Sequence, residues 1–502
     1  MFTREYKQFV RENGEMIRKK HTWSRYVHRV SNSRMKSFIR PNATVLAIGP
    51  WVKDLLEELS PSMAVGVDHL CDLAEDTPDS NITIHGAYSE LQNYQETFDY
   101  ILLPFSLGFM EDIMVSLVDL QRFCHEHTRI IIIYYSKSWQ PLVRLSEILG
   151  LKVKASEMNW VPPKEIENMM ELSDYQIIKD FMFCLMPVKI PLISNLVNKY
   201  LGNLPLLRRL GLCSIIVGRS RIASSPERKA RSEPMVSIIV PARNEEGHIA
   251  DIVRRTPDFP GGSEIIFVEG NSTDDTRGAI ERVIIENPNR KILLLIQDGK
   301  GKKNADLKGF AAAKGDICLI LDADMTVPPE AIPRFVNTLV SGKAEFVNGS
   351  RLVYPMRGKA MRFVNLLGNL FFGKAFSYLL DQPVRDTLCG TKVMWRYDYQ
   401  KMLDIFKYFG NLDPFGDFDL LFGATCLNLK IVDLPIRYEE RVYGETNISR
   451  WRHGAILLKI VFLGISKLKF NWLPMFSNGT VRSPLPPHDS AAGLNKTGIS
   501  AP

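Results

Sequence analysis

The 502-residue sequence predicts an α/β protein of two domains. On both sides of residues 219–234, short β-branched runs alternate with longer amphipathic stretches, which is typical of parallel strands joined by crossover helices. Residues 219–234 have no hydrophobic period and are rich in serine, proline and charge, as linkers are. The chain is also too long for one ordinary core. We therefore expect domains over residues 41–218 and 235–470, joined by a linker over 219–234.

Four strands are expected in each half of the chain, because each half contains four short runs of β-branched and aliphatic residues. The runs cover residues 44–48, 64–67, 100–103 and 130–134 in the first half, and residues 236–240, 264–268, 291–296 and 317–321 in the second. In parallel sheets of this kind, ligands bind at the carboxyl ends of the strands. The polar residues that follow these runs are therefore the candidate site residues.

The two ends of the chain differ in composition from the domains. Residues 1–40 hold eleven Lys or Arg against three Glu, a net charge of +8, with apolar residues interspersed. This basic segment is expected to be helical, and two interpretations stay open: it packs on the domain behind it, or it meets anionic lipid. We expect no nucleic-acid partner. Residues 477–502 lose apolar periodicity and are expected to form a disordered tail.

The cysteines and the hydropathy pattern bear on location. Seven cysteines lie far apart, without a C-x-x-C pair, which favours reduced thiols and a cytoplasmic protein. No uninterrupted apolar stretch has the length of a membrane-spanning helix. Residues 361–380 and 456–470 suit either helices packed on a sheet or helices lying at the cytoplasmic face of a membrane. Peripheral membrane contact is thus left open.

A pair of acids follows the strand expected at 317–321. Asp322 and Asp324 lie two residues apart where a buried strand emerges into a loop. A hard cation such as Mg²⁺ takes one or two carboxylates together with phosphate oxygens and water. The pair therefore indicates a divalent metal on a substrate diphosphate. The alternative is that the two acids are ordinary turn or helix-capping residues.

Three further segments follow strand ends in the second half. Pro241 stops the first strand, and the polar groups after it can face a nucleotide base. Glu269 ends the next strand, where a carboxylate can accept hydrogen bonds from ribose hydroxyls. Residues 298–304 form a flexible basic loop suited to phosphate contact and include Lys302. Together with the acid pair, these segments indicate a nucleotide site.

These segments, with residues 348–351, 386–390, 416–420 and 441–447, resemble the inverting family-2 glycosyltransferases over residues 235–470. Dolichol-phosphate mannose synthase and polyprenyl-phosphate sugar transferases are the members most similar in these motifs. The resemblance implies a GT-A fold, a nucleoside diphosphate sugar donor, and Mg²⁺ or Mn²⁺. It places Pro241, Ala242, Asn244 and Glu245 near the nucleoside, Glu269 near base or ribose, Lys302 at the nucleotide sugar, and Asp322 and Asp324 around the metal and diphosphate.

The acceptor side of the resemblance leaves alternatives. Asp417 and Asp324 are the catalytic candidates; Asp417 is either the general base or a cap of the helix that follows it. Arg351 and Arg362 match positions that hold an acceptor phosphate, with a surface ion pair as the alternative for Arg362. The acceptor is expected to be polyprenyl phosphate or a surface glycan. Gly270 and Thr326 depart from the mannose synthase pattern, so metal preference and donor identity stay open.

The first half carries a second resemblance. Residues 45–51, 65–68 and 97–103 resemble the opening motifs of class I S-adenosylmethionine-dependent methyltransferases, which have a Rossmann-like fold. The resemblance implies that Gly49 and Asp68 would bind S-adenosylmethionine. Trp51 and other bulky residues stand where the family has small ones, and they obstruct close backbone approach. We favour a structural or acceptor-presenting role; the alternatives are a bifunctional transferase and methyltransferase, or a non-enzymatic glycan- or lipid-binding scaffold.

Overall fold

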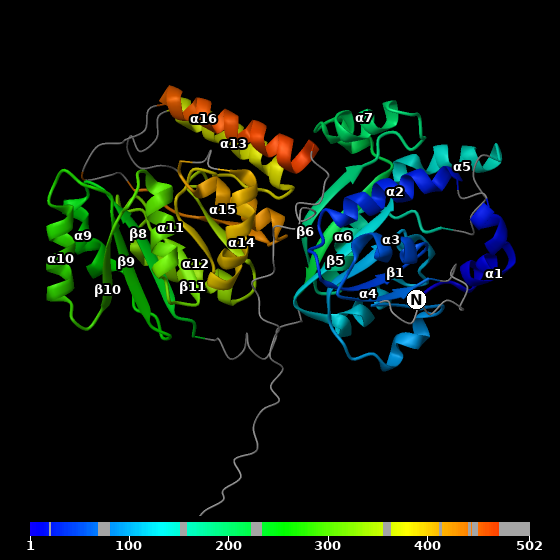
Figure 1. The fold of residues 1–502 in the computed structure, drawn as a ribbon, viewed down its shortest axis with the longest axis horizontal. Coiled ribbons are helices and arrows are strands. Elements are labelled where there is room, and N and C mark those ends of the chain that lie inside the picture. The colour runs from blue at the N-terminus through cyan, green and yellow to red at the C-terminus, as the bar shows by residue number, and fades with distance from the viewer. Residues whose placement is uncertain are drawn as a thin grey trace, which may run out of the picture.

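The structure, a computed structural model, describes residues 1–19, 22–68, 81–150, 158–221, 233–354, 363–410, 414–439, 443 and 450–470. It contains two seven-stranded sheets, each flanked by helices, that lie side by side (Figure 1). The architecture is mixed α/β, and both sheets consist mainly of parallel strands. Arg362, residues 69–80, and the stretch expected to form the tail lie outside the described residues.

The first sheet has the strand order β3-β2-β1-β4-β5-β7-β6. Its strands are β1 Thr44–Ile48, β2 Met63–Val67, β3 Ile82–His85, β4 Phe98–Pro104, β5 Cys124–Tyr135, β6 Tyr175–Phe183 and β7 Cys213–Ser220. Only β7 runs antiparallel to its neighbours. The order reverses between β1 and β4, and such a switch point leaves a crevice at the carboxyl ends of the strands. The four strands expected in this half are all present.

The helices of the first half cover both faces of this sheet. They are α1 Arg4–Lys19, α2 Thr22–Lys36, α3 Val52–Leu59, α4 Ile113–Leu120, α5 Gln140–Ile148, α6 Pro163–Leu172 and α7 Ile193–Lys199. Phe2, Tyr6 and Val10, in and before α1, are buried in a core cluster with Ile48 and Val67. The basic segment therefore packs on the domain behind it, as far as its side chains are described.

The second sheet has the order β10-β9-β8-β11-β13-β12-β14. Its strands are β8 Val236–Ala242, β9 Ser263–Glu269, β10 Lys291–Ile296, β11 Ile317–Ile320, β12 Phe346–Ser350, β13 Lys392–Trp395 and β14 Ile431–Pro435. Strands β8 to β11 are mutually parallel, whereas β13 runs antiparallel between β11 and β12. The order reverses between β8 and β11, so the carboxyl ends of these strands frame the expected site.

Eight helices flank the second sheet within the described ranges. They are α9 Glu246–Arg255, α10 Thr276–Glu286, α11 Lys302–Ala312, α12 Ile332–Val340, α13 Phe363–Leu380, α14 Arg396–Phe409, α15 Asp417–Cys426 and α16 Arg450–Gly464, the last continued by a π-helical turn, Ile465–Phe470. Helices α13 and α16 bury one side in the core through residues such as Phe376 and Ile460. Nowhere in the described chain is a helix both long and apolar enough to cross a bilayer.

The two sheets are joined by a buried polar interface. Arg129 and Arg219 of the first half lie 2.8 Å and 3.1 Å from the Glu345 carboxylate of the second. Lys179 Nζ donates to the Thr425 carbonyl at 2.7 Å and to Asn428 Oδ1 at 2.8 Å. Buried charges are costly unless paired, and these are paired only across the interface. The interface therefore holds the two halves in one relative orientation.

Candidate functional site

One lysine links acids from two elements of the second domain. Lys302 opens α11, and its Nζ lies 2.8 Å from Oδ1 of Asp322, which follows β11. The same Nζ lies 3.8 Å from Oδ2 of Asp417, the first residue of α15. Lys392, at the start of β13, places its Nζ 2.9 Å from Oδ1 of Asp417. Asp322, Lys302, Asp417 and Lys392 thus form a row of alternating charges, here called the charge row.

Glycines make this close approach possible. A Cβ on Gly390 would overlap both Asp322 Oδ2 and Lys302 Nζ, so no side chain fits there. Gly301, before α11, and Gly416, before α15, have φ angles of 88° and 81°, in the region that favours glycine. The backbone can therefore turn sharply into both helices and bring their first side chains to the end of β11.

The charge row is ionised. Burial acts to raise the pKa of Asp322, but Lys302 and then Lys392 and Arg351 outweigh it and lower that pKa. Burial acts to lower the pKa of Lys302, but Asp322 and Asp417 outweigh it and hold it well above its ordinary value. The site therefore presents fixed charges of both signs at the carboxyl ends of parallel strands, an arrangement that suits a metal-bound phosphate.

Asp306 is a further acid at this site that the sequence analysis missed. It lies on α11, is 3% exposed, and neither carboxyl oxygen has a hydrogen-bond partner in the described structure. Burial raises its pKa well above the ordinary value despite Lys302, and the negative charges of Asp417 and Asp322 act in the same direction. The available signal was its position four residues after Lys302, which places both on one helix face.

Asp324 shapes the turn after β11. Its Oδ1 accepts from the Thr326 amide at 3.2 Å and from the Thr326 hydroxyl at 2.8 Å. Met325 between them has a φ of 53°. Within the described residues no group of three or more His, Cys, Asp or Glu is arranged to hold a metal. A metal here would take one or both carboxylates of Asp322 and Asp324 and complete its shell with phosphate oxygens and water, which fits the oxygen donors present.

The residues expected near the nucleoside come together at the adjacent ends of β8 and β9. Pro241 and Ala242 pair with Val268 and Glu269. Glu269 Oε1 accepts from the Ser272 amide at 2.6 Å, which orders the turn after β9. Asn244, with a φ of 59°, accepts from the Thr273 amide at 2.7 Å and receives a bond from its own amide to Ser272 Oγ at 3.0 Å. Asn244 therefore fastens the two strand-end turns together.

Glu245 has an internal partner. Its Oε2 lies 2.9 Å from His248 Nδ1, one turn along α9, and its amide donates to Thr276 Oγ1 at 2.9 Å. The residue is buried. The Tyr443 ring packs against His248 with centroids 5.8 Å apart. Glu245 thus holds α9 in place beside the nucleoside end of the site.

Arg351 forms a buried two-pronged ion pair. Its Nε and Nη2 lie 2.7 Å and 2.8 Å from the two carboxyl oxygens of Asp386, and its amide donates to Asp386 Oδ2 at 3.0 Å. The guanidinium also stacks on Tyr438, 5.2 Å from the ring centroid. Arg351 follows β12 and contributes to the low pKa of Asp322, so it lies on the same side of the sheet as the charge row. Its proposed partner Arg362 is outside the described residues.

The described partners of Asp417 are the two lysines of the charge row, and neighbouring Asp419 lies 2.5 Å from Lys303 Nζ. Both acids open α15, where a negative charge is also favoured by the helix dipole. The geometry adds an ion-pairing role to the two interpretations of Asp417, as general base and as helix cap.

Gly49 and Asp68 of the first domain both have structural partners. A Cβ on Gly49 would lie 2.5 Å from the Pro104 carbonyl and 2.6 Å from Ser106 Oγ. Asp68 is buried, and its Oδ2 accepts from the Val52 amide at 3.2 Å at the start of α3. The glycine therefore serves chain packing and the acid caps a helix.

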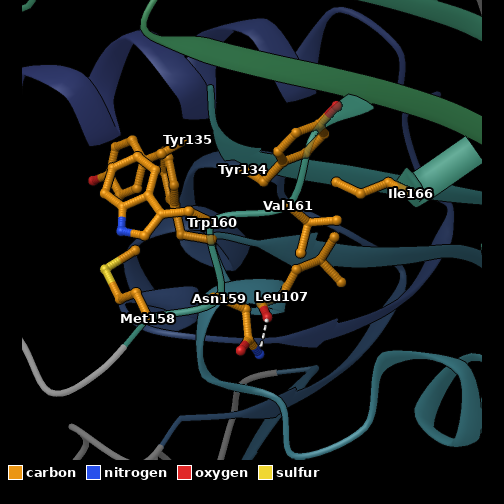
Figure 2. A pocket seen from close by; sticks show the side chains of 10 residues that line it. Leu107, Tyr134, Tyr135, Met158, Asn159, Trp160, Val161 and Ile166 are labelled. Carbon is orange, nitrogen blue, oxygen red and sulfur yellow. Dashed lines mark hydrogen bonds between the residues drawn. The ribbon is translucent and has the colours of Figure 1, made fainter. Parts of the chain in front are cut away.

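A small cavity lies at the carboxyl ends of β4 and β5 (Figure 2). It is lined by Phe105, Leu107, Gly108, Tyr134, Tyr135, Met158, Asn159, Trp160, Val161 and Ile166. Asn159 closes one side by donating to the Leu107 carbonyl at 3.3 Å. The cavity volume is about 10 Å³, enough for one water molecule. This cavity cannot hold a cofactor the size of S-adenosylmethionine.

The second domain is thus a nucleotide-binding type of α/β domain with a charged site at its switch point. Residues 237–403 match the sequence model of glycosyl transferase family 2. The second domain therefore belongs to that family of glycosyltransferases, and its mixed sheet is GT-A-like.

Curated relatives agree with this assignment. The undecaprenyl-phosphate 4-deoxy-4-formamido-L-arabinose transferase of Enterobacter sp. (strain 638) is 27% identical over 45% of this chain and 66% of its own length. A low-salt glycan biosynthesis hexosyltransferase of Haloferax volcanii is 28% identical over 45% of this chain and 53% of its own length. The chain thus spans just under two thirds of the length of the undecaprenyl-phosphate transferase.

Among solved structures, glucosyl-3-phosphoglycerate synthase of Mycobacterium tuberculosis, in complex with Mn²⁺, uridine diphosphate and glucosyl-3-phosphoglycerate, is 19% identical. The match covers 48% of this chain and 82% of that one, with a TM-score of 0.33. A likeness at that level supports no conclusion about this chain.

Proposed function

We propose that this protein transfers a sugar, with inversion, from a nucleoside diphosphate sugar to polyprenyl phosphate, with a divalent metal. The observation that carries the proposal is the charge row at the end of β11, inside a family-2 domain. Relatives named as undecaprenyl-phosphate sugar transferases support the acceptor class. A surface-glycan hydroxyl is the second candidate acceptor, supported by the relative named as a glycan biosynthesis hexosyltransferase.

The donor would lie across the ends of β8, β9 and β11. Asp322 and Asp324 would hold Mg²⁺ or Mn²⁺, which supplies positive charge to the diphosphate as it leaves. Lys302 is already cationic and partly neutralised by Asp322, so a metal that takes Asp322 would release Lys302 to contact the diphosphate. Glu269 would accept from the ribose, beside Pro241 and Ala242, while Asn244 and Glu245 hold the turns in place.

The acceptor would approach from the side of Arg351. An acceptor phosphate is already anionic, so it needs positive charge more than a general base. The Arg351 and Asp386 pair keeps the guanidinium oriented by two hydrogen bonds, which leaves its remaining N–H groups aimed in one direction. For a hydroxyl acceptor, Asp417 is the candidate base. The masked Arg362 stays a candidate for acceptor contact.

For the first domain, we propose a structural or acceptor-presenting role on a methyltransferase-like fold. The reversal of strand order between β1 and β4 supports such a fold. The internal bonds of Gly49 and Asp68 argue against S-adenosylmethionine binding. We keep the domain limits 41–218 and 235–470 and a location at the cytoplasmic face of a membrane as parts of this proposal.

The test is release of nucleoside diphosphate from UDP-, GDP- and dTDP-sugars, with Mg²⁺, Mn²⁺ or EDTA, and with or without polyprenyl phosphate. Metal-dependent release from one donor that the lipid stimulates supports the proposal and identifies the nucleotide. Metal-dependent release without lipid stimulation favours a hydroxyl acceptor. Absence of release with every donor and acceptor contradicts the proposal.

A further inference from the structure

The first domain carries a large exposed apolar surface in a single segment. Residues 188–210 contain α7 and the short helical turns that follow it, and their exposed apolar side chains are Val188, Ile190, Leu192, Ile193, Leu196, Tyr200, Leu201, Leu204, Leu206 and Leu210. Leu192 and Leu206 are 80% and 78% exposed. Contiguous apolar patches of this kind mark surfaces that contact another molecule or a membrane.

This segment continues onto the second domain. The Tyr200 and Phe470 rings lie 5.2 Å apart, Asn203 Nδ2 donates to the Lys469 carbonyl at 2.9 Å, and the Tyr378 hydroxyl donates to the Asn203 carbonyl. Helices α13 and α16 expose Leu370, Phe371, Leu458 and Phe462. Helices α7, α13 and α16 lie along the upper edge of the molecule in Figure 1. We call the exposed apolar residues of 188–210, α13 and α16 the apolar face.

The charges around the apolar face are all of one sign. Residues 188–210, 363–380 and 450–470 together contain ten Lys or Arg and no Asp or Glu. With 56 acids in the 502 residues, about seven would be expected in segments of this total length. Apolar side chains with interspersed cations and no anions match the boundary between lipid chains and anionic headgroups.

The uniform charge also argues against a second copy of this chain as the partner. In a symmetric dimer each patch would meet itself, so its lysines and arginines would face cations without an acid to pair with. An anionic bilayer has no such conflict.

The apolar face connects directly to the charge row. Phe376 of α13 packs on Phe418, the residue between Asp417 and Asp419, with ring centroids 4.8 Å apart. Gly373 of α13 lies so close to Arg385 that a Cβ would be 2.5 Å from its carbonyl, and the next residue, Asp386, holds Arg351. A surface resting on α13 would therefore be one helix thickness from the acceptor side of the site.

We propose that residues 188–210 of the first domain form, with α13 and α16, a face that docks on an anionic lipid bilayer. The inference rests on the proposed function in one respect: a lipid-linked acceptor requires the site to be held at a membrane. It assigns the first domain a specific task, since the exposed apolar side chains of residues 188–210 outnumber those of α13 and α16. The buried interface with the second domain would transmit that docking geometry to the site.

The test uses the full chain and vesicles of phosphatidylcholine with or without a third of phosphatidylglycerol. We expect co-sedimentation with anionic vesicles that weakens as salt is raised. The double variant Leu192→Glu/Leu206→Glu should bind at least tenfold more weakly, because both side chains are exposed and would place carboxylates against lipid. Ile285→Glu is the matched control, since Ile285 is 79% exposed but lies on α10; its binding should stay within twofold of the parent.

Circular dichroism and release of nucleoside diphosphate in detergent-dispersed polyprenyl phosphate accompany each variant. Lost vesicle binding with retained detergent activity supports the inference. Vesicle binding that depends on Leu192 and Leu206, without transfer by any variant, leaves the inference standing and removes the proposed function. The inference is overturned if the parent does not bind anionic vesicles or if the double variant binds as the parent does. It is also overturned if light scattering finds a dimer that the double variant dissolves.

Discussion

Lys302 Nζ lies 2.8 Å from Asp322 Oδ1 and 3.8 Å from Asp417 Oδ2, so one cation joins the end of β11 to the start of α15. Lys302 itself opens α11. Three elements that are distant in sequence thus meet through a single ammonium group. The relationship matters for function because the same cation that balances two acids in the protein can balance a diphosphate once a metal engages one of those acids.

Lys302→Met should lower transfer by about 100-fold, the usual effect of removing one group that stabilises developing charge. It should also destabilise the fold by about 1–3 kcal/mol, since Asp322 and Asp417 lose a buried partner. Initial rates of nucleoside diphosphate release and urea unfolding measure the two effects. Lys308→Met is the control, because Lys308 pairs with the exposed Asp298. Parental turnover in Lys302→Met would contradict a role at the diphosphate.

Asp322→Asn and Asp324→Asn should each abolish detectable transfer while leaving the circular dichroism spectrum unchanged, because each removes a carboxylate that a divalent ion requires. Calorimetric titration of Mn²⁺ in the presence of nucleoside diphosphate checks metal binding directly. Asp298→Asn is a matched acid-to-amide change at a side chain that is 82% exposed, and it should behave as the parent does. Unchanged Mn²⁺ affinity in both site variants would refute the metal assignment.

Asp386→Ala should destabilise the protein by about 3–5 kcal/mol, because it leaves the buried Arg351 guanidinium without its partner. Arg351→Lys should also be poorly tolerated, since an ammonium cannot reproduce two parallel hydrogen bonds. Asp251→Ala breaks an exposed pair with Arg254 and should cost less than about 1 kcal/mol. Urea denaturation of all three separates the predictions; equal small losses would show that the Arg351 pair is not load-sharing.

Glu345→Gln tests the interface between the domains through its pH dependence. Burial acts to raise the pKa of Glu345, but Arg129, Arg219 and the Lys430 amide outweigh it and lower that pKa to about 2. A lowered folded-state pKa gives stability that is present above the unfolded value, near 4.5, and is lost as pH falls toward 2. The variant should therefore be less stable than the parent at pH 7, by about 3–5 kcal/mol.

The difference between Glu345→Gln and the parent should shrink as pH falls from about 4.5 toward 2, because the parent carboxylate becomes protonated in that window. Urea unfolding at a series of pH values measures it. Glu281→Gln, at an exposed helical pair with Arg277, is the control and should show little difference at any pH. A constant difference across the window would rule out the ion pair as its source.

Calorimetric titration with S-adenosylmethionine should give no binding heat, because Gly49 and Asp68 are engaged within the protein. Gly49→Ala should instead lower the thermal unfolding midpoint, since the added methyl would press on Pro104 and Ser106. Gly410→Ala is a matched control where no atom lies within 4 Å of the added group, although its φ of 80° adds some strain of its own. Micromolar binding of the cofactor would reverse this view of the first domain.

Much of the strand content was predictable because it depends on local pattern. Each expected run in both halves forms a strand, from Thr44–Ile48 to Ile317–Ile320, since a run of buried β-branched residues between turn signals has few alternatives. The position of Asp322 and Asp324 just after β11 followed from the same pattern. The additional strands β6, β7, β12, β13 and β14 were not among the expected runs, and their pairing depends on contacts distant in sequence.

The sequence by itself determined the α/β class, the acid pair behind a buried strand, and the motifs of a family-2 domain, because these reside in short contiguous segments. Only the tertiary structure decided what those residues touch. Lys392 reaches Asp417 because β13 inserts antiparallel beside β11, Arg351 is paired by Asp386 from across a long connection, and Asp306 is buried by the packing of α11 on the sheet. Ion pairing and burial are set by spatial distance, and one-dimensional spacing does not encode distance between elements.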